Sequence, residues 1–242
     1  MKKIVMVLLL ISCVVFSGCA NQSISKSKET RLQVAVSIVP QATFVKAVAG
    51  DLVDVVTMIP PGKSPGNYAP TPQEMEKFSK SSLYFAIGVP AENANIIPKS
   101  AELNKSLKVI KMNDEVKKVY PEREFSPGNR DPHIWLSPKR AQAKIDPKNK
   151  SVYEKNAKDY IAKLDKLDRH IKSSLATLPN KTFIVYHPAF GYFADDYGLK
   201  MVSLEEEGKE ATAKDLGQKI DEAKQQGIKV IFYQAEIDSK QS

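Results

Sequence analysis

Cysteine is almost absent from this chain of 242 residues. The two cysteines, Cys13 and Cys19, both lie within the first 19 residues. If Cys13 leaves with a signal peptide, the mature protein can form no internal disulfide. A zinc site built from cysteines is excluded as well, because too few thiols remain. Histidine is also scarce, with three in the whole chain.

Runs of basic residues are missing too. The formal net charge is +8, which becomes +6 once Lys2 and Lys3 are subtracted. The lysines are spread among glutamates and aspartates, and no run of five or more basic residues occurs. This pattern indicates a solvated basic surface close to an anionic membrane. We therefore predict no nucleic-acid partner.

The N-terminus contains a single short apolar run, from Ile4 to Phe16, preceded by two lysines. Such a segment is typical of a secretion signal and is too short for a membrane-spanning helix. The following letters, FSGC, resemble a bacterial lipobox, with Phe16 where leucine is usual. We predict a signal peptide over 1–18, lipid on Cys19 and a flexible tether over 19–31. The alternatives are an uncleaved anchor or secretion with Cys19 unmodified.

The remainder of the chain alternates short apolar stretches with amphipathic helices. LQVAVSIVP, VDVVTMIPPG, SLYFAIG and LKVIKM read as strands separated by helical segments, and the alternation resumes with KTFIVYH. This order predicts an α/β fold with parallel sheets and helices on both faces. We expect two (β/α) lobes joined by one long amphipathic helix, with a ligand cleft between the lobes. The expected bounds are 32–147 for the N-terminal lobe, 148–178 for the helix and 179–242 for the C-terminal lobe.

Two histidines stand where a regular element meets a loop. His133 follows Asp131-Pro132, and His187 ends the strand TFIVYH. Ligands of open α/β sheets lie beyond the carboxyl ends of strands, so one histidine from each lobe could meet in a cleft. There each imidazole could bind a metal, with a carboxylate or carbonyl holding its other nitrogen. The alternative for His133 is a hydrogen-bonded core residue, and His170, in mid-helix, is expected at the surface or partly packed.

Enzyme motifs are not expected. We predict neither an HExxH helix nor a nucleophile elbow, and therefore no enzyme. A metal-assisted hydrolase that uses His133, His187 and a glutamate base is the alternative.

Three motifs occur in order: PPGKSPGNYAPTP, DPHIWLSPKR and YHPAFGYFADDYGL. Together they resemble the metal-binding substrate-binding lipoproteins of zinc/manganese-type ABC importers, known as cluster A-I, over residues 33–242. The resemblance implies a rigid connecting helix and a metal ion held between the lobes. His133 and His187 match two family ligands, and a histidine at position 187 is more similar to zinc-type members. Imidazole also suits zinc chemically, although manganese or another divalent metal is an alternative.

The resemblance further implies an exported monomer at the outer face of the cytoplasmic membrane, with an ABC permease and its ATPase as partners. A role in surface adhesion stays open.

The chain departs from the family pattern in three places. Gly66 stands where the first-loop histidine is usual, the region after Arg140 is short, and the sequence ends at Ser242, before the expected late carboxylate. The C-terminal lobe is therefore expected to be truncated, and the altered site predicts, as an alternative, changed ligand specificity or a degenerate metal site. Zinc prefers four ligands, so other side chains must complete the site. The candidates, each of which also reads as an ordinary loop or helix-cap residue, are Asn67, Glu92, Glu207, Glu210 and Asp238.

Overall fold

The computed structural model describes residues 31–136, 150–205, 212–228 and 230–233. No helix in these ranges is both long and apolar enough to cross a membrane. The predicted signal peptide, Cys19 and the region after Arg140 lie outside the described residues. The lobe and helix bounds given above, 32–147, 148–178 and 179–242, remain predictions from the sequence.

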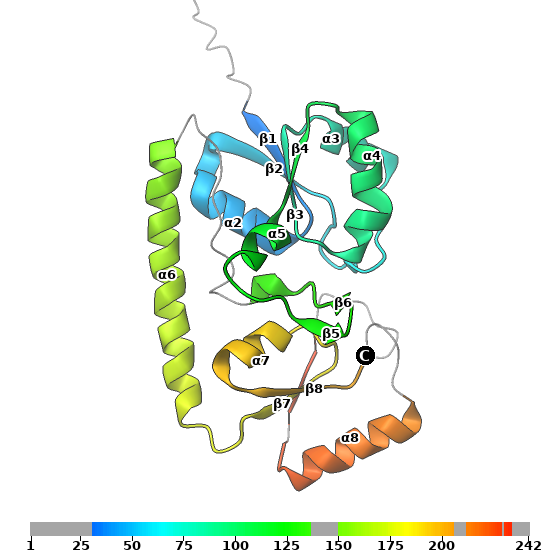
Figure 1. The fold of residues 1–242 in the computed structure, drawn as a ribbon, viewed down its shortest axis with the longest axis vertical. Helices are drawn as coiled ribbons and strands as arrows, with labels where there is room; N and C mark the ends of the chain where they lie inside the picture. The colour runs from blue at the N-terminus through cyan, green and yellow to red at the C-terminus, as the bar shows by residue number, and fades with distance from the viewer. Residues whose placement is uncertain (1–30, 137–149, 206–211, 229, 234–242) are drawn as a thin grey trace, which may run out of the picture. The chain divides into compact units, whose positions relative to one another are not determined.

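A four-stranded parallel sheet with the order β2-β1-β3-β4 forms the first half of the described chain (Figure 1). Its strands are the apolar stretches that the sequence predicted, and the helices between them are the crossovers that parallel strands require. The strands are β1 (Leu32–Val36), β2 (Val53–Thr57), β3 (Leu83–Ala86) and β4 (Lys108–Lys111). The helices are α2 (Val39–Ala49), α3 (Pro72–Ser79), α4 (Ile97–Leu103) and α5 (Met112–Lys117), with a 3-10 turn at Gly50–Leu52 and a π turn at Glu92–Ile96.

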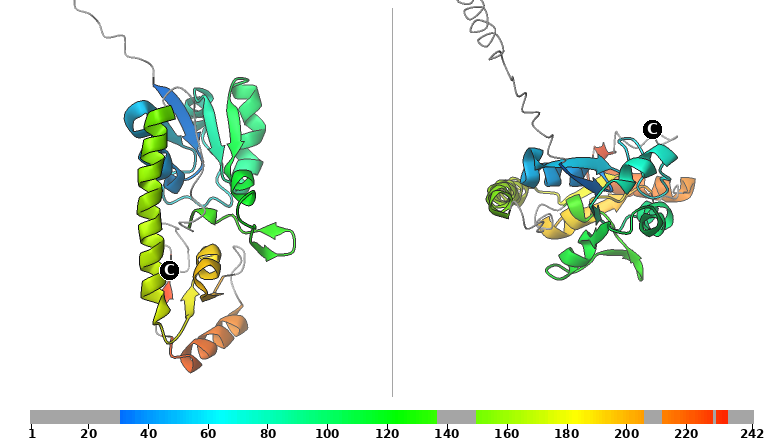
Figure 2. Two further views of the ribbon diagram at one scale, coloured as in Figure 1. Left: turned by 60° about the vertical axis from the view of Figure 1, so that its left-hand side comes forward. Right: turned by 90° about the horizontal axis from the view of Figure 1, so that it is seen from above.

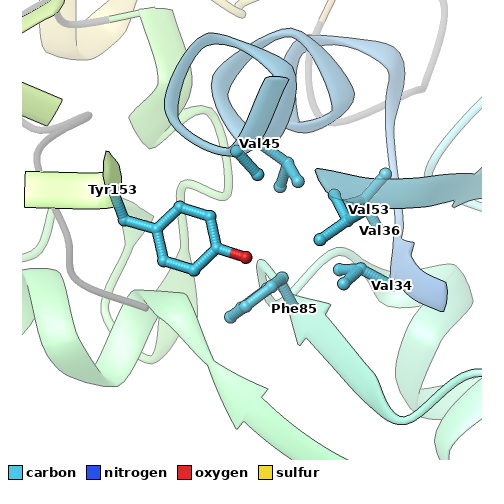
Figure 3. Close-up of a cluster of buried hydrophobic side chains, with 7 residues drawn as sticks. Val34, Val36, Val45, Val53, Phe85 and Tyr153 are labelled. Carbon is cyan, nitrogen blue, oxygen red and sulfur yellow. The ribbon is translucent and has the colours of Figure 1, made fainter. Parts of the chain in front are cut away.

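Alternating side chains of β1 divide the core between the two faces of this sheet. Val34 and Val36 lie in a cluster with α2 and with Tyr153 of α6 (Lys150–Ala176), whereas Ala35 faces a second cluster. Figure 3 shows the ring of Tyr153 pointing into the first cluster. This division follows from the period of two along a strand. The second cluster comprises Ala35, Met58, Met75, Phe78, Tyr84, Ala86 and Ile96.

A capping box begins α3. Thr71 Oγ1 accepts the backbone N–H of Glu74 at 3.3 Å, and Glu74 Oε2 accepts the backbone N–H of Thr71 at 2.7 Å. Each side chain thus satisfies a donor that the first helical turn leaves free.

The long segment predicted as one amphipathic helix is α6, of 27 residues. It packs on α2, where Asn156 Nδ2 donates to the carbonyl of Val48 (3.0 Å) and Tyr160 meets Phe44. Downstream, β7 (Thr182–Val185), β8 (Lys200–Ser203) and β9 (Ile231–Phe232) form a parallel sheet in the order β8-β7-β9. It is accompanied by α7 (Gly191–Tyr197) and α8 (Ala213–Gln225).

The segment that follows α5 contains a short antiparallel hairpin. Its strands are β5 (Glu124–Ser126) and β6 (Asn129–Arg130), and a 3-10 turn (Ile134–Leu136) follows. Figure 2 shows the hairpin as a small ribbon separate from the four-stranded sheet. Gly128 allows the tight connection because its φ is +80°.

Candidate functional site

His133 is held by the carboxylate of Asp131, two residues earlier. Asp131 Oδ1 accepts the backbone N–H of His133 at 3.0 Å and lies 2.8 Å from its Nδ1. Asp131 is fully buried and His133 is 9% exposed. An Asp side chain that accepts the N–H two residues on is a local turn motif, so the sequence Asp-Pro-His favours this geometry. A proton on Nδ1 leaves the lone pair of Nε2 for a ligand.

His187 has the same arrangement in the second sheet. It follows β7, and Glu205 follows β8, the parallel neighbour of β7. The backbone N–H of Glu205 donates to the carbonyl of Tyr186 (2.9 Å), which continues the strand pairing and places Glu205 Oε2 2.9 Å from His187 Nδ1. This carboxylate also leaves Nε2 as the free ring nitrogen.

The structure brings the two predicted histidines together. Their ring centroids are 5.3 Å apart, with an angle of 75° between the ring planes. Imidazole nitrogens that share one zinc ion are about 3.3 Å apart, given Zn–N bonds of about 2.05 Å in a tetrahedron. Aromatic rings flank His133, with Trp135 at 5.2 Å and Phe125 at 6.1 Å between centroids.

The additional ligand candidates differ in their burial. Asn67 is exposed in the loop before α3, and Gly66 beside it is exposed as well. Glu92 is fully buried, and its carboxylate accepts the backbone N–H groups of Ile87 (2.8 Å) and Gly88 (2.7 Å) as well as the hydroxyl of Ser37. Burial raises the pKa of Glu92 despite these hydrogen bonds. The remaining candidates, Glu207, Glu210 and Asp238, lie outside the described residues.

Within the described residues, no group of three or more His, Cys, Asp or Glu side chains is arranged to hold a metal ion. Of the predicted ligands, the two imidazoles are the ones that the described part of the chain brings together. His170 is exposed on α6, as expected.

Asp131 and Glu205 were not predicted from the sequence as partners of the histidines. Asp131 was visible as part of DPH, and Glu205 opens the run EEEGKE directly after a strand. The rule that parallel neighbours end at the same edge of a sheet would have placed Glu205 beside His187.

Residues 62–66 read GKSPG and match the letters G-x-S-x-G, but they do not form a nucleophile elbow. They form turns in the long connection between β2 and α3 rather than a sharp strand-to-helix turn. Ser64 Oγ accepts the backbone N–H of Gly66 at 3.2 Å.

Comparison with known proteins agrees with this fold. The high-affinity zinc uptake system protein ZnuA of Bacillus subtilis (strain 168) is 31% identical over 249 residues, covering 93% of this chain and 78% of the relative. The iron ABC transporter substrate-binding lipoprotein MtsA of Streptococcus pyogenes serotype M1 is 31% identical over 246 residues, covering 92% and 78%. A crystal structure of ZnuA aligns with a TM-score of 0.79 and 33% identity, covering 87% of this chain and 84% of that one.

A parallel α/β fold of this kind, with these relatives, defines a substrate-binding protein of a metal ABC transporter. Within that class, residues 34–242 match the family described as zinc-uptake complex component A, periplasmic (ZnuA), and the chain belongs to it.

Proposed function

We propose that the protein captures a zinc ion outside the cytoplasm and delivers it to an ABC permease and its ATPase. The observation that carries this proposal is the pair of imidazoles, His133 and His187, with ring centroids 5.3 Å apart. Each has a carboxylate on Nδ1, the arrangement that orients histidine ligands of zinc. In this proposal the protein is a carrier and not an enzyme.

Zinc is favoured over manganese by the donor atoms. Imidazole nitrogen suits zinc, whereas manganese prefers carboxylate, carbonyl and water oxygens. The relatives named above differ in metal, since one is named for zinc and the other for iron. The metal is therefore argued from the side chains of this chain, with manganese or iron as competitors in the test.

The remaining ligands and the anchoring belong to the same proposal. Two imidazoles are too few for a tight site, and a further carboxylate, amide or water must complete the four positions that zinc takes. We propose that the mature chain begins at Cys19, carries lipid there and acts as a monomer at the outer face of the cytoplasmic membrane.

Metal content and affinity test this proposal. Zinc is measured by mass spectrometry on purified protein, followed by competitive titration with zinc, manganese and iron. The variants are His133→Ala and His187→Ala, and His170→Ala is the matched control because His170 is exposed on α6. We expect near-stoichiometric zinc in the wild type and the control, and loss in both site variants. Binding that is unchanged in both site variants would contradict the site.

A binding protein with changed ligand specificity is the second candidate, and Gly66 is the observation that favours it. A Cβ added to Gly66 would meet only Ser64 Oγ, at 3.4 Å, so the position has room for a side chain. Tyr68, two residues on, packs against the core cluster that contains Ile134. The loop therefore lies near the segment that carries His133. If zinc is the ligand, we expect Gly66→His to add a nitrogen donor and to raise the zinc affinity. A thermal-shift response to other solutes and not to metals would instead favour changed ligand specificity.

A further inference from the structure

The guanidinium of Arg123, just before β5, joins two carboxylates. Its Nη1 lies 3.1 Å from Oδ2 of Asp131, and its Nε donates to Oδ2 of Asp195 in α7 at 2.9 Å. Asp131 is fully buried, while the Arg123 side chain is 26% exposed. Asp131 thus uses one oxygen for His133 and the other for Arg123.

The same guanidinium lies directly against the start of α7. A Cβ added at Gly191 would be 2.3 Å from Nη1 of Arg123 and 2.5 Å from its Cζ, so only glycine allows this approach. The backbone N–H of Arg123 also donates to the hydroxyl of Tyr192 (3.0 Å), and that hydroxyl donates to the carbonyl of Asp131 (3.1 Å). These contacts join Arg123 to the helix that begins four residues after His187.

We propose that Arg123 is a positioning residue of the metal site. It fixes the carboxylate of Asp131 so that Oδ1 faces Nδ1 of His133, and it ties this pair to α7 next to His187. The inference deepens the proposed function and rests on it.

The physical basis is the cost of a buried carboxylate. Asp131 is removed from water, so its charge needs partners for both oxygens. The planar guanidinium presents several donors in a fixed geometry and can serve two carboxylates at once, which a lysine ammonium does with less directional control. Without Arg123, Oδ2 of Asp131 loses its ionic partner, and the carboxylate can rotate away from His133. Nδ1 of His133 then loses the acceptor that defines its tautomer.

The experiment compares Arg123→Gln, which removes the charge and the fork, with Gly191→Ala, which displaces the guanidinium without removing it. Gly191 has no positive φ, so alanine there introduces crowding and no backbone strain. Arg31→Gln is the matched control, because Arg31 forms an exposed ion pair with Asp54. Circular dichroism and thermal unfolding establish that each variant is folded.

Three measurements are made on each protein. Competitive titration gives the zinc affinity, and the visible spectrum of the cobalt-loaded protein reports the geometry of the ligands. Nitrogen-15 NMR of the histidine rings in the metal-free protein reports which nitrogen of His133 carries the proton.

We expect Arg123→Gln to weaken zinc binding by about 10- to 100-fold, as loss of partners behind the ligands does elsewhere. The cobalt spectrum should change, and the His133 ring should shift from the Nδ1–H form toward a mixture of tautomers. Gly191→Ala should change the zinc affinity, the cobalt spectrum and the His133 tautomer in the same direction. Arg31→Gln should leave all three measurements unchanged.

Folded Arg123→Gln protein with wild-type affinity, cobalt spectrum and ring-nitrogen shifts would overturn the inference. A wild type that binds no metal would refute the proposed function instead. In that case the ring-nitrogen shifts still decide the role of Arg123, since they are measured without metal.

Discussion

The hydroxyl of Tyr192 should contribute several times more to the free energy of unfolding than an ordinary tyrosine hydroxyl does. Tyr192 is fully buried in the core cluster that also contains Ile134. Its oxygen donates to the carbonyl of Asp131 and accepts the backbone N–H of Arg123. The substitution Tyr192→Phe keeps the ring and its packing but leaves both backbone groups without this partner.

Each buried polar group that loses its partner costs about 1–3 kcal/mol. The Asp131 carbonyl is buried and the Arg123 N–H partly buried, so we expect Tyr192→Phe to lower the free energy of unfolding by about 2–4 kcal/mol. With a urea m value of about 2 kcal/mol/M, the midpoint should fall by about 1–2 M. Urea titrations followed by circular dichroism measure this directly.

Tyr160→Phe is the control, because the Tyr160 ring contacts Phe44 while its hydroxyl makes no hydrogen bond to the described part of the chain. We expect the control to change stability by less than about 0.5 kcal/mol, as substitutions without a specific mechanism do. If Tyr192→Phe is equally mild, water replaces the hydroxyl at no cost, and the contact does not join the His133 segment to α7.

Three further predictions concern the cap of α3, the tryptophan and the buried carboxyl. Thr71→Ala should lower the free energy of unfolding by about 1 kcal/mol, because the N–H of Glu74 loses its acceptor; an unchanged urea midpoint would contradict this. Trp135 is the sole tryptophan and its ring lies 5.2 Å from that of His133, so zinc should change its fluorescence, and a flat titration would argue against metal at His133. Burial raises the pKa of Glu92 above 4.5, so the folded protein holds a proton that the unfolded chain releases. Stability should therefore fall as pH rises from about 4.5 toward the raised pKa, and Glu92→Gln should remove this slope in urea titrations across pH.

The strands could be predicted from sequence because they lie in short apolar stretches, rich in β-branched or aromatic residues, between helical segments. Because side chains alternate along a strand, Val34 and Val36 face one cluster and Ala35 faces the other. The position of His187 could be predicted as well, since it follows β7 and ligands of parallel sheets lie beyond the carboxyl ends of the strands. His133 instead follows the antiparallel β5–β6 hairpin.

The β5–β6 hairpin could not be predicted, because its strands have three and two residues and no apolar alternation. Contacts from distant parts of the chain hold it in place. Arg130 Nη2 donates to the carbonyls of Ile87 and Gly88 at 3.0 Å each, and Arg123 pairs with Asp195. Such tertiary contacts leave no periodic signal in the sequence.

Both histidines have a carboxylate on Nδ1, but the two carboxylates are placed by different parts of the structure. This difference decides which histidine loses its partner first when the protein is destabilised. His133 takes its carboxylate from Asp131, two residues away, so its geometry depends on a local turn and on Arg123. His187 takes its carboxylate from Glu205, 18 residues away, through the pairing of β7 with β8. Loosening the second sheet therefore disturbs His187 first and leaves His133 with its partner. In the proposed metal site, the two histidines would therefore be lost one at a time, and we expect His187, which depends on long-range pairing, to be lost first.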